Sequence, residues 1–126
     1  MQAKGTYGIT REETYHNGQV IFEDGDSRDC FYIILKGSVE ISKNAQRREY
    51  IIEKLKPGEI FGEMELIGDT ERNVNAKAIG ETRLGVLDQE LFEREFSQLS
   101  RQFRSILETI PLRLKKMVDR ACDLSS

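Results

Sequence analysis

The sequence predicts a mainly β domain (a barrel, roll or sandwich) followed by a helical arm. Two observations lead to this prediction. Through the first three quarters of the 126-residue chain, short apolar runs alternate with glycines. That pattern is typical of many short strands joined by regular turns. From Asp88 to Asp123 there is no glycine, and apolar residues recur every three or four positions, the period of an α-helix.

Glycine turns set the bounds of the expected strands. The Lys36-Gly37 pair separates two runs that we expect to be hairpin partners. In the second of these runs, Val39 and Ile41 alternate with a charged residue, the pattern of a half-buried strand. The expected strands cover residues 19–22, 30–36, 38–42, 50–55, 74–79 and 83–87.

Two helices are expected in the arm. A short helix over 89–97 has Asp88 as its N-cap. A longer helix over about 100–122 restarts at Ser100 and contains Pro111. A proline inside a helix removes one backbone hydrogen bond, so we expect this second helix to be kinked or broken there.

Length and composition favour one folded unit over residues 1–126, with the β part at about 14–88 and the arm at about 89–122. The net charge of −3 argues against a nucleic-acid-binding surface. No apolar stretch is long enough to cross a bilayer, and the first residues contain no apolar secretion signal. We therefore expect a cytoplasmic protein with Cys30 and Cys122 as reduced structural thiols.

Residues 61–78 have the features of an anion-binding site. Gly62 removes a side chain where the backbone approaches another group closely. The segment 63–67 is long enough for one helical turn, which we expect to stop at Gly68 and to present free N–H groups at its start. Arg72 follows in a loop and can return over that turn, where its planar guanidinium suits two oxygens of a phosphate.

This segment resembles the phosphate-binding cassette of cyclic nucleotide-binding domains, the family of the bacterial catabolite activator and of the regulatory subunit of cyclic-AMP-dependent protein kinase. The resemblance covers roughly residues 14–122 and includes the runs 18–26, 29–41 and 55–63. It implies an antiparallel, jelly-roll-like β-roll (a double-stranded β-helix). The implied ligand is a cyclic nucleotide, with cyclic AMP the leading candidate, and neither a metal nor another cofactor. The cassette match is carried by Phe61-Gly62-Glu63, Leu66-Ile67, Thr70, Arg72 and Lys77-Ala78.

The resemblance also implies a role for each site residue. Glu63 would accept a hydrogen bond from the ribose 2′-OH, and Arg72 would bind the cyclic phosphate. Backbone amides near Met64 and Glu65 would complete the phosphate contacts. The complete predicted ligand-binding set is Gly62, Glu63, Met64, Glu65, Arg72, Asn73 and Val74.

Three positions depart from the usual pattern of the family. A small residue usually stands at the position of Glu65, and Ala, Ser or Thr at the positions of Asn73 and Val74. We expect Glu65 to be a solvated surface charge, because its side chain leaves a helical turn roughly 200° away from that of Glu63. A second carboxylate near a phosphate site nevertheless weakens anion binding. The pocket is thus expected to bind weakly, to bind an unusual nucleotide, or to have lost binding.

The leading interpretation is a regulatory sensor domain that relays ligand occupancy through its C-terminal helices to an unidentified effector. The alternative is a degenerate, ligand-free interaction or dimerisation module of the same fold. We expect no catalytic activity, because His16 is the sole histidine and cannot supply a catalytic or metal-binding set.

The arm also suggests a homodimer through an apolar face of the long helix. Its cationic residues are expected to form the solvated face of the helix. No DNA-recognition helix follows the arm, so the chain as given is expected not to read DNA. Either the chain is part of a longer regulator, or it is a stand-alone sensor. The expected dimer face comprises Phe103, Leu107, Ile110, Leu114, Met117 and Ala121.

Overall fold

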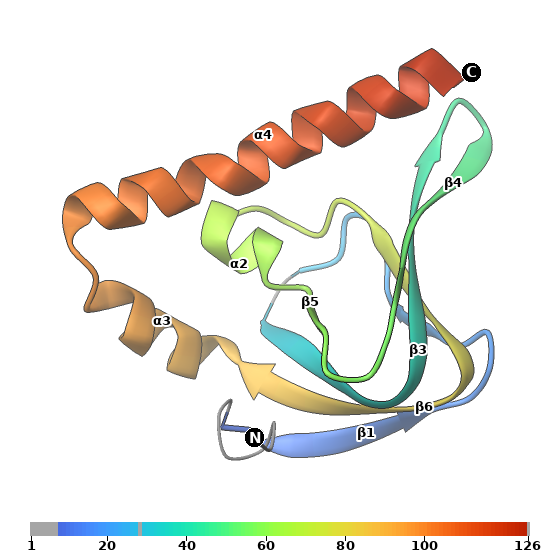
Figure 1. The fold of residues 1–126 in the computed structure, drawn as a ribbon, viewed down its shortest axis with the longest axis horizontal. Helices are drawn as coiled ribbons and strands as arrows, with labels where there is room; N and C mark the ends of the chain where they lie inside the picture. The colour runs from blue at the N-terminus through green and yellow to red at the C-terminus, as the bar shows by residue number, and fades with distance from the viewer. Residues whose placement is uncertain (1–7, 28, 126) are drawn as a thin grey trace.

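The computed structural model describes residues 8–27 and 29–125, which form an antiparallel β-roll followed by helices (Figure 1). This architecture confirms the predicted fold class. Strand order in the sheet is β1-β6-β3-β4, with β2 paired to β6 and β5 paired to β3. The strands are β1 (Arg11–Tyr15), β2 (Val20–Phe22), β3 (Cys30–Ala45), β4 (Arg48–Leu55), β5 (Ile60–Phe61) and β6 (Asn75–Asp88). The helices are α2 (Met64–Gly68), α3 (Gln89–Ser97) and α4 (Arg101–Ser125).

The roll is built around two long strands, where the sequence analysis expected four short ones. Strand β3 runs through Gly37, so the expected hairpin at Lys36-Gly37 is wrong. The chain does not turn there, because β3 and β6 stay paired on both sides of a register shift. Gly37 has φ 84°, and a Cβ at this residue would lie 2.4 Å from the backbone oxygen of Glu81. The glycine therefore marks a bulge at which two backbones approach closely.

The interior of the roll is apolar. Ile34, Leu84 and Val86 are buried in one cluster, together with the neighbouring rings of Phe22, Tyr32 and Phe61. Cys30 and Cys122 are both buried and are free thiols, as expected. The burial of apolar side chains on both β3 and β6 explains why the two long strands form the centre of the fold.

Helix α3 confirms the expected helix over 89–97. It begins after Asp88, whose backbone is extended. The Asp88 side chain accepts a hydrogen bond from the Leu91 amide at 2.9 Å. That contact satisfies one of the free N–H groups of the first turn. The predicted N-cap is therefore confirmed.

Helix α4 is 25 residues long and continues through Pro111, so the expected break is wrong. Its start confirms the expected restart at Ser100, whose Oγ accepts from the Phe103 amide at 3.1 Å. Pro111 is buried, and a Cβ built at Gly68 would lie 3.2 Å from its Cβ. Close packing of the proline ring on α2 stabilises the helix at the point where one backbone bond is missing.

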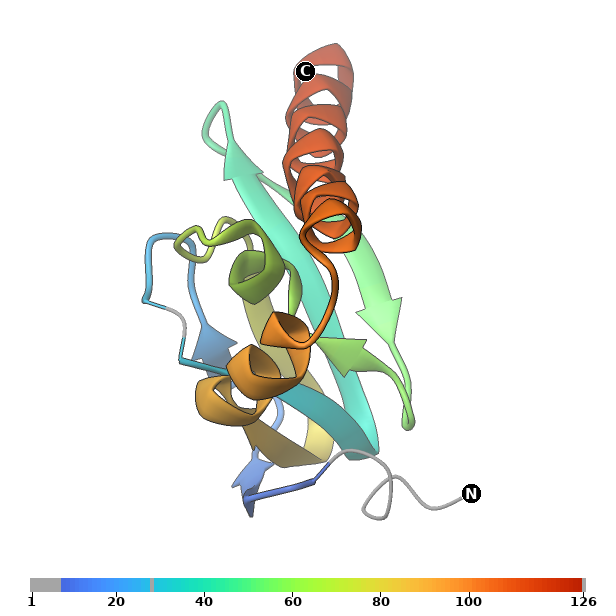
Figure 2. The same ribbon diagram turned by 90° about the vertical axis from the view of Figure 1, so that its left-hand side faces the viewer.

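Helix α2 lies beneath α4 in Figure 1, between that helix and β5. Its end differs by one residue from the expectation, because Gly68 is helical and Asp69 takes the left-handed conformation at φ 54°. Gly68 instead makes room for Pro111. Figure 2 shows α4 extending along the β3–β4 hairpin, and Gln46 Nε2 at the hairpin tip donates to Asp123 Oδ1 at 3.3 Å. None of the helices in the described part of the chain has the length and apolar character that a membrane span requires.

Candidate functional site

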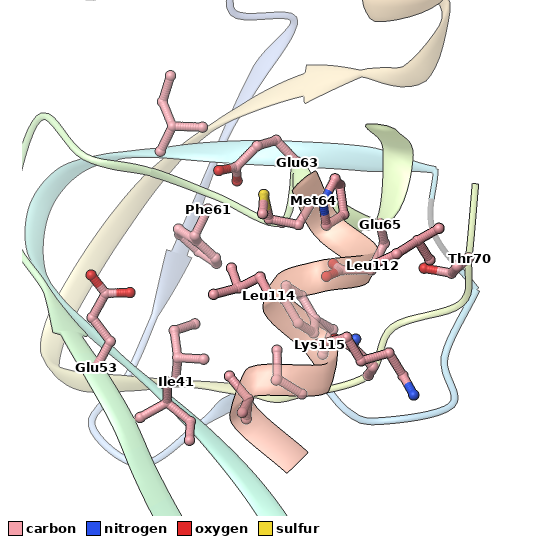
Figure 3. Close-up of a pocket in the computed structure, with 18 of the residues that line it drawn as sticks. Ile41, Glu53, Phe61, Glu63, Met64, Glu65, Thr70, Leu112, Leu114 and Lys115 are labelled. Carbon is pink, nitrogen blue, oxygen red and sulfur yellow. The ribbon is translucent and has the colours of Figure 1, made fainter. Parts of the chain in front are cut away.

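A cavity of about 150 Å³ lies between the roll, α2 and α4 (Figure 3). Its walls are largely apolar, and its polar groups come mainly from α2, the loop that follows it, and α4. Six of the seven predicted site residues line it: Gly62, Glu63, Met64, Glu65, Asn73 and Val74. The seventh, Arg72, lies behind the wall and is not among the lining residues.

The approach to α2 is shaped by Gly62. This residue has φ 85°, a left-handed conformation that favours glycine, and a Cβ built there would lie 3.0 Å from Arg72 Nη1. The Gly62 carbonyl accepts a hydrogen bond from the same nitrogen at 2.6 Å. The group that approaches Gly62 closely is thus the Arg72 guanidinium.

Arg72 is only 2% exposed and returns over α2 as predicted. Its backbone is tied to the loop after β2: the Gly25 amide donates to the Arg72 carbonyl at 2.7 Å, and the Arg72 amide donates to the Asp26 carbonyl at 2.9 Å. Its Nη2 donates to the Cys30 carbonyl at 2.6 Å. The guanidinium carbon lies 4.2 Å from the centre of the Phe22 ring, which adds a cation–π contact.

The prediction for Glu65 is wrong. Glu65 is 5% exposed, and its Oε1 accepts from Arg72 Nη1 at 2.7 Å. The side chain does leave α2 away from Glu63, but Arg72 lies on that side instead of solvent. A buried guanidinium attracts the nearest carboxylate strongly, because little water screens the pair. The sequence held a signal for this pairing, namely an acidic residue where the family usually has a small one.

Glu63 lines the cavity and is only partly exposed. Burial raises the pKa of its carboxyl, because a charged carboxylate loses hydration there; the nearby Glu65 raises it further, and a hydrogen bond from its own backbone lowers it. Figure 3 shows the Glu63 and Glu65 side chains leaving the turn in different directions. The two carboxylates therefore face different parts of the site.

The loop after Arg72 is held by Lys43 of β3. Lys43 Nζ donates to the Asn73 carbonyl at 2.7 Å and lies 3.4 Å from Asp24 Oδ2 and 3.9 Å from Asp119 Oδ1 of α4. Val74 packs against the apolar cluster of the roll while it lines the cavity. Lys43 thus joins the cassette loop to the helical arm.

Sequence reasoning missed the part of the cavity that α4 contributes. The overlooked α4 residues that line it are Pro111, Leu112, Leu114, Lys115, Val118 and Asp119. A signal was present, because Leu112 and Val118 are apolar residues outside the dimer face that the spacing predicted. Within residues 8–27 and 29–125, no group of three or more His, Cys, Asp or Glu is arranged to hold a metal ion.

Several known proteins are similar to this chain in sequence or in structure. A regulatory subunit of cyclic-AMP-dependent protein kinase from Dictyostelium discoideum is 30% identical over 99 residues, which cover 75% of this chain and 30% of that protein. A cyclic AMP receptor protein from Thermus thermophilus is 35% identical over 77 residues, which cover 60% of this chain and 36% of that protein. The cyclic-AMP-bound structure of the EAL enzyme Bd1971 is 31% identical, with a TM-score of 0.79, and the match covers 88% of this chain and 30% of that chain.

This chain therefore spans about a third of the length of each of these relatives. The family model described as the cyclic nucleotide-binding domain matches residues 12–98, from β1 to the end of α3. That range contains every residue of the predicted site. The chain belongs to the cyclic nucleotide-binding domain family.

Proposed function

We propose that this chain binds a cyclic nucleotide, with cyclic AMP as the leading candidate, in the cavity beneath α2. The observation that carries the proposal is that six cassette residues converge on one cavity while Arg72 hydrogen-bonds to two of them. The family membership supports the ligand class, and the solved relative named for its cyclic-AMP-bound form supports the choice of nucleotide.

Each role follows from the chemistry of the group. Arg72 binds the cyclic phosphate, because its guanidinium is charged at all physiological pH values and matches phosphate oxygens. Glu63 accepts from the ribose 2′-OH, because its carboxylate lines the cavity and a neutral hydroxyl donor does not repel it. The first amides of α2, at Met64 and Glu65, supply further phosphate contacts, and Asn73 and Val74 close the wall.

We also propose that occupancy is relayed through α4. The helix contributes one wall of the cavity and touches α2 where Pro111 meets Gly68. A ligand that draws α2 inward changes that contact. It can bias the position of α4 only by binding one arrangement more tightly than the other.

Calorimetric titration with cyclic AMP and cyclic GMP tests the site. The control is the charge-neutral double variant Glu65→Gln/Arg72→Gln, which removes the guanidinium without leaving a buried charge unpaired. We expect saturable binding by the wild type and none by the double variant, with both proteins folded by circular dichroism. Absence of binding in the folded wild type, or equal binding in the double variant, would contradict the proposal.

A ligand-free interaction module is the second candidate function. Two observations favour it: Glu65 already neutralises Arg72, and α4 leaves several large apolar side chains exposed. The exposed set includes Phe103, Ile106, Ile110, Leu114 and Met117. Sedimentation of the wild type and of Met117→Glu distinguishes the two. A dimer that dissociates in the variant, from a protein that binds no nucleotide, supports this candidate.

A further inference from the structure

The buried pair of Arg72 and Glu65 has a consequence for ligand binding. Among the hydrogen-bond partners of the Arg72 guanidinium, two are backbone carbonyls, of Gly62 and Cys30, and the third is the Glu65 carboxylate. The two carbonyls belong to the chain around β5 and β3 and cannot leave without disturbing the roll. Only the carboxylate can rotate away from Arg72 about side-chain bonds.

The position of Glu65 separates the guanidinium from the cavity. Glu65 lines the cavity and Arg72 does not, yet the two side chains are in contact at 2.7 Å. Arg72 is also almost wholly closed to solvent. Because Glu65 lines the cavity and contacts Arg72, a ligand in the cavity meets the Glu65 carboxylate before it reaches the guanidinium.

The charge balance of the site follows from this arrangement. One guanidinium faces one carboxylate in a buried place, so the pair is neutral before any ligand enters. A phosphodiester added beside an unmoved Glu65 would place two anions against one cation where water screens little. Glu65 accepts from Arg72 Nη1, and Arg72 Nε is buried with no hydrogen-bond partner among the residues that the structure describes. A phosphate offers more oxygens to the guanidinium than the single contact of Glu65 uses.

We propose that Glu65 is a tethered anion that holds the phosphate position of this site, so that a cyclic nucleotide binds only by exchanging its phosphate for the Glu65 carboxylate at Arg72. This inference rests on the proposed function and names the residue that sets the charge preference of the pocket. Glu65 lies on α2, the turn on which Pro111 packs at Gly68. The proposed exchange therefore takes place on the same short helix that contacts α4.

The proposal predicts that Glu65 affects the binding of charged and uncharged ligands differently. Cyclic AMP has to displace Glu65, and the free energy needed for that displacement lowers its affinity. Adenosine has the same base and a ribose but no phosphate, so it fits beside an unmoved Glu65. Removal of the carboxylate should therefore strengthen the binding of cyclic AMP and leave adenosine almost unaffected.

The test is a calorimetric titration of both ligands into the wild type, Glu65→Ala, Glu65→Gln and Glu71→Ala. Glu71 is exposed and adjacent to Arg72, so its variant makes the same change in net charge without touching the pair. Glu65→Gln keeps an acceptor oxygen for Arg72 and remains informative if Glu65→Ala does not fold.

We expect Glu65→Gln to bind cyclic AMP about tenfold more tightly than the wild type, and adenosine within about twofold of it. Glu71→Ala should behave as the wild type. Binding of cyclic AMP that is unchanged by both Glu65 variants overturns the exchange and leaves the proposed function standing. No binding of cyclic AMP by any folded variant overturns the proposed function itself. Binding by the Glu65 variants alone overturns both the exchange and the proposed function of the wild type, because the wild-type carboxylate is then never displaced.

Discussion

The apolar core of the roll and the Arg72–Glu65 pair beside α2 are both buried, but they consist of opposite kinds of side chain. Ile34, Leu84 and Val86 belong to the first interior, which is an apolar cluster. Arg72 and Glu65 make the second a buried ion pair held by backbone carbonyls. Burial of apolar surface stabilises the first directly, whereas the second must recover the hydration that both charges lose.

The difference separates an interior that stabilises the fold from one that, under the proposed function, binds the ligand. A substitution that shortens an apolar side chain in the roll leaves a cavity, and the loss of stability increases with the volume of that cavity. A buried ion pair depends on both partners, because either one alone is an unpaired charge. An interior of the second kind suits a site whose partner is to be exchanged.

The largest expected effect is the loss of one partner of the pair. Arg72→Met leaves the Glu65 carboxylate buried without its cation, and we expect the free energy of unfolding to fall by about 3–5 kcal/mol. Urea denaturation followed by circular dichroism measures the change. A loss below about 1 kcal/mol would mean that Glu65 reaches water once Arg72 is gone, and that the second interior is not closed.

A core truncation should come next in size. Leu84→Ala removes buried methyl groups from the first interior and should lower the free energy of unfolding by about 2–5 kcal/mol. The matched control is Leu114→Ala on α4, where the side chain is 44% exposed and the loss should stay below about 1 kcal/mol. Equal losses at both positions would place α4 within the same cooperative core as the roll.

Replacement of the whole pair should restore stability. In Glu65→Leu/Arg72→Met neither charge of the pair remains, so we expect stability to return to within about 1 kcal/mol of the wild type. The same urea titration gives the coupling between the two positions as the departure from additivity. Additive losses from the two single variants would mean that each residue stabilises the fold through other contacts.

The smallest expected effect is a gain in stability, from the substitution Glu63→Gln. Burial raises the pKa of Glu63, so the folded state holds this proton more tightly than the unfolded chain. The contribution of Glu63 to stability is therefore full below the ordinary carboxyl pKa of about 4.3 and is lost as pH rises through the raised value. Glu63→Gln should thus be more stable than the wild type near pH 7, by up to about 1 kcal/mol, and equal to it near pH 3.

Thermal unfolding of both proteins across that pH range checks the sign. A difference that grows towards low pH would mean that the folded protein stabilises the charged form of Glu63. Under the proposed function, Glu63→Gln should also weaken cyclic AMP binding, because an amide is a poorer acceptor than a carboxylate for the ribose hydroxyl. Glu63 would then decrease the stability of the fold while it contributes to ligand binding.

Local patterns were sufficient for the elements whose signals lie close together in the chain. The helical period and the Asp88 cap predicted α3, and the interval from Gly62 to Arg72 predicted an arginine that returns over a helical turn. The cap of α3 depends on a contact within three residues, where the backbone has few alternatives. The seven candidate site residues came from the resemblance of one continuous segment to the phosphate-binding cassette of the family.

Three features were decided by the tertiary structure. Glycine is typical of turns, but Gly37 lies in a strand that pairs with β6 and forms a bulge there. Pro111 does not end α4, because its ring packs on Gly68. Glutamate is usually a surface residue, but the loop that follows α2 places Arg72 against Glu65. In each case the deciding partner lies elsewhere in the chain or across a packed interface, and local propensity does not contain that partner.

By itself, the sequence predicted a mainly β domain with a helical arm, since both follow from a local period or spacing. Its resemblance to the family identified the continuous segment of candidate site residues. The tertiary structure alone decided that α4 closes the cavity and that Glu65 stands between the cavity and Arg72. The physical reason is that burial and pairing of charges depend on distances in space, which a linear spacing does not specify.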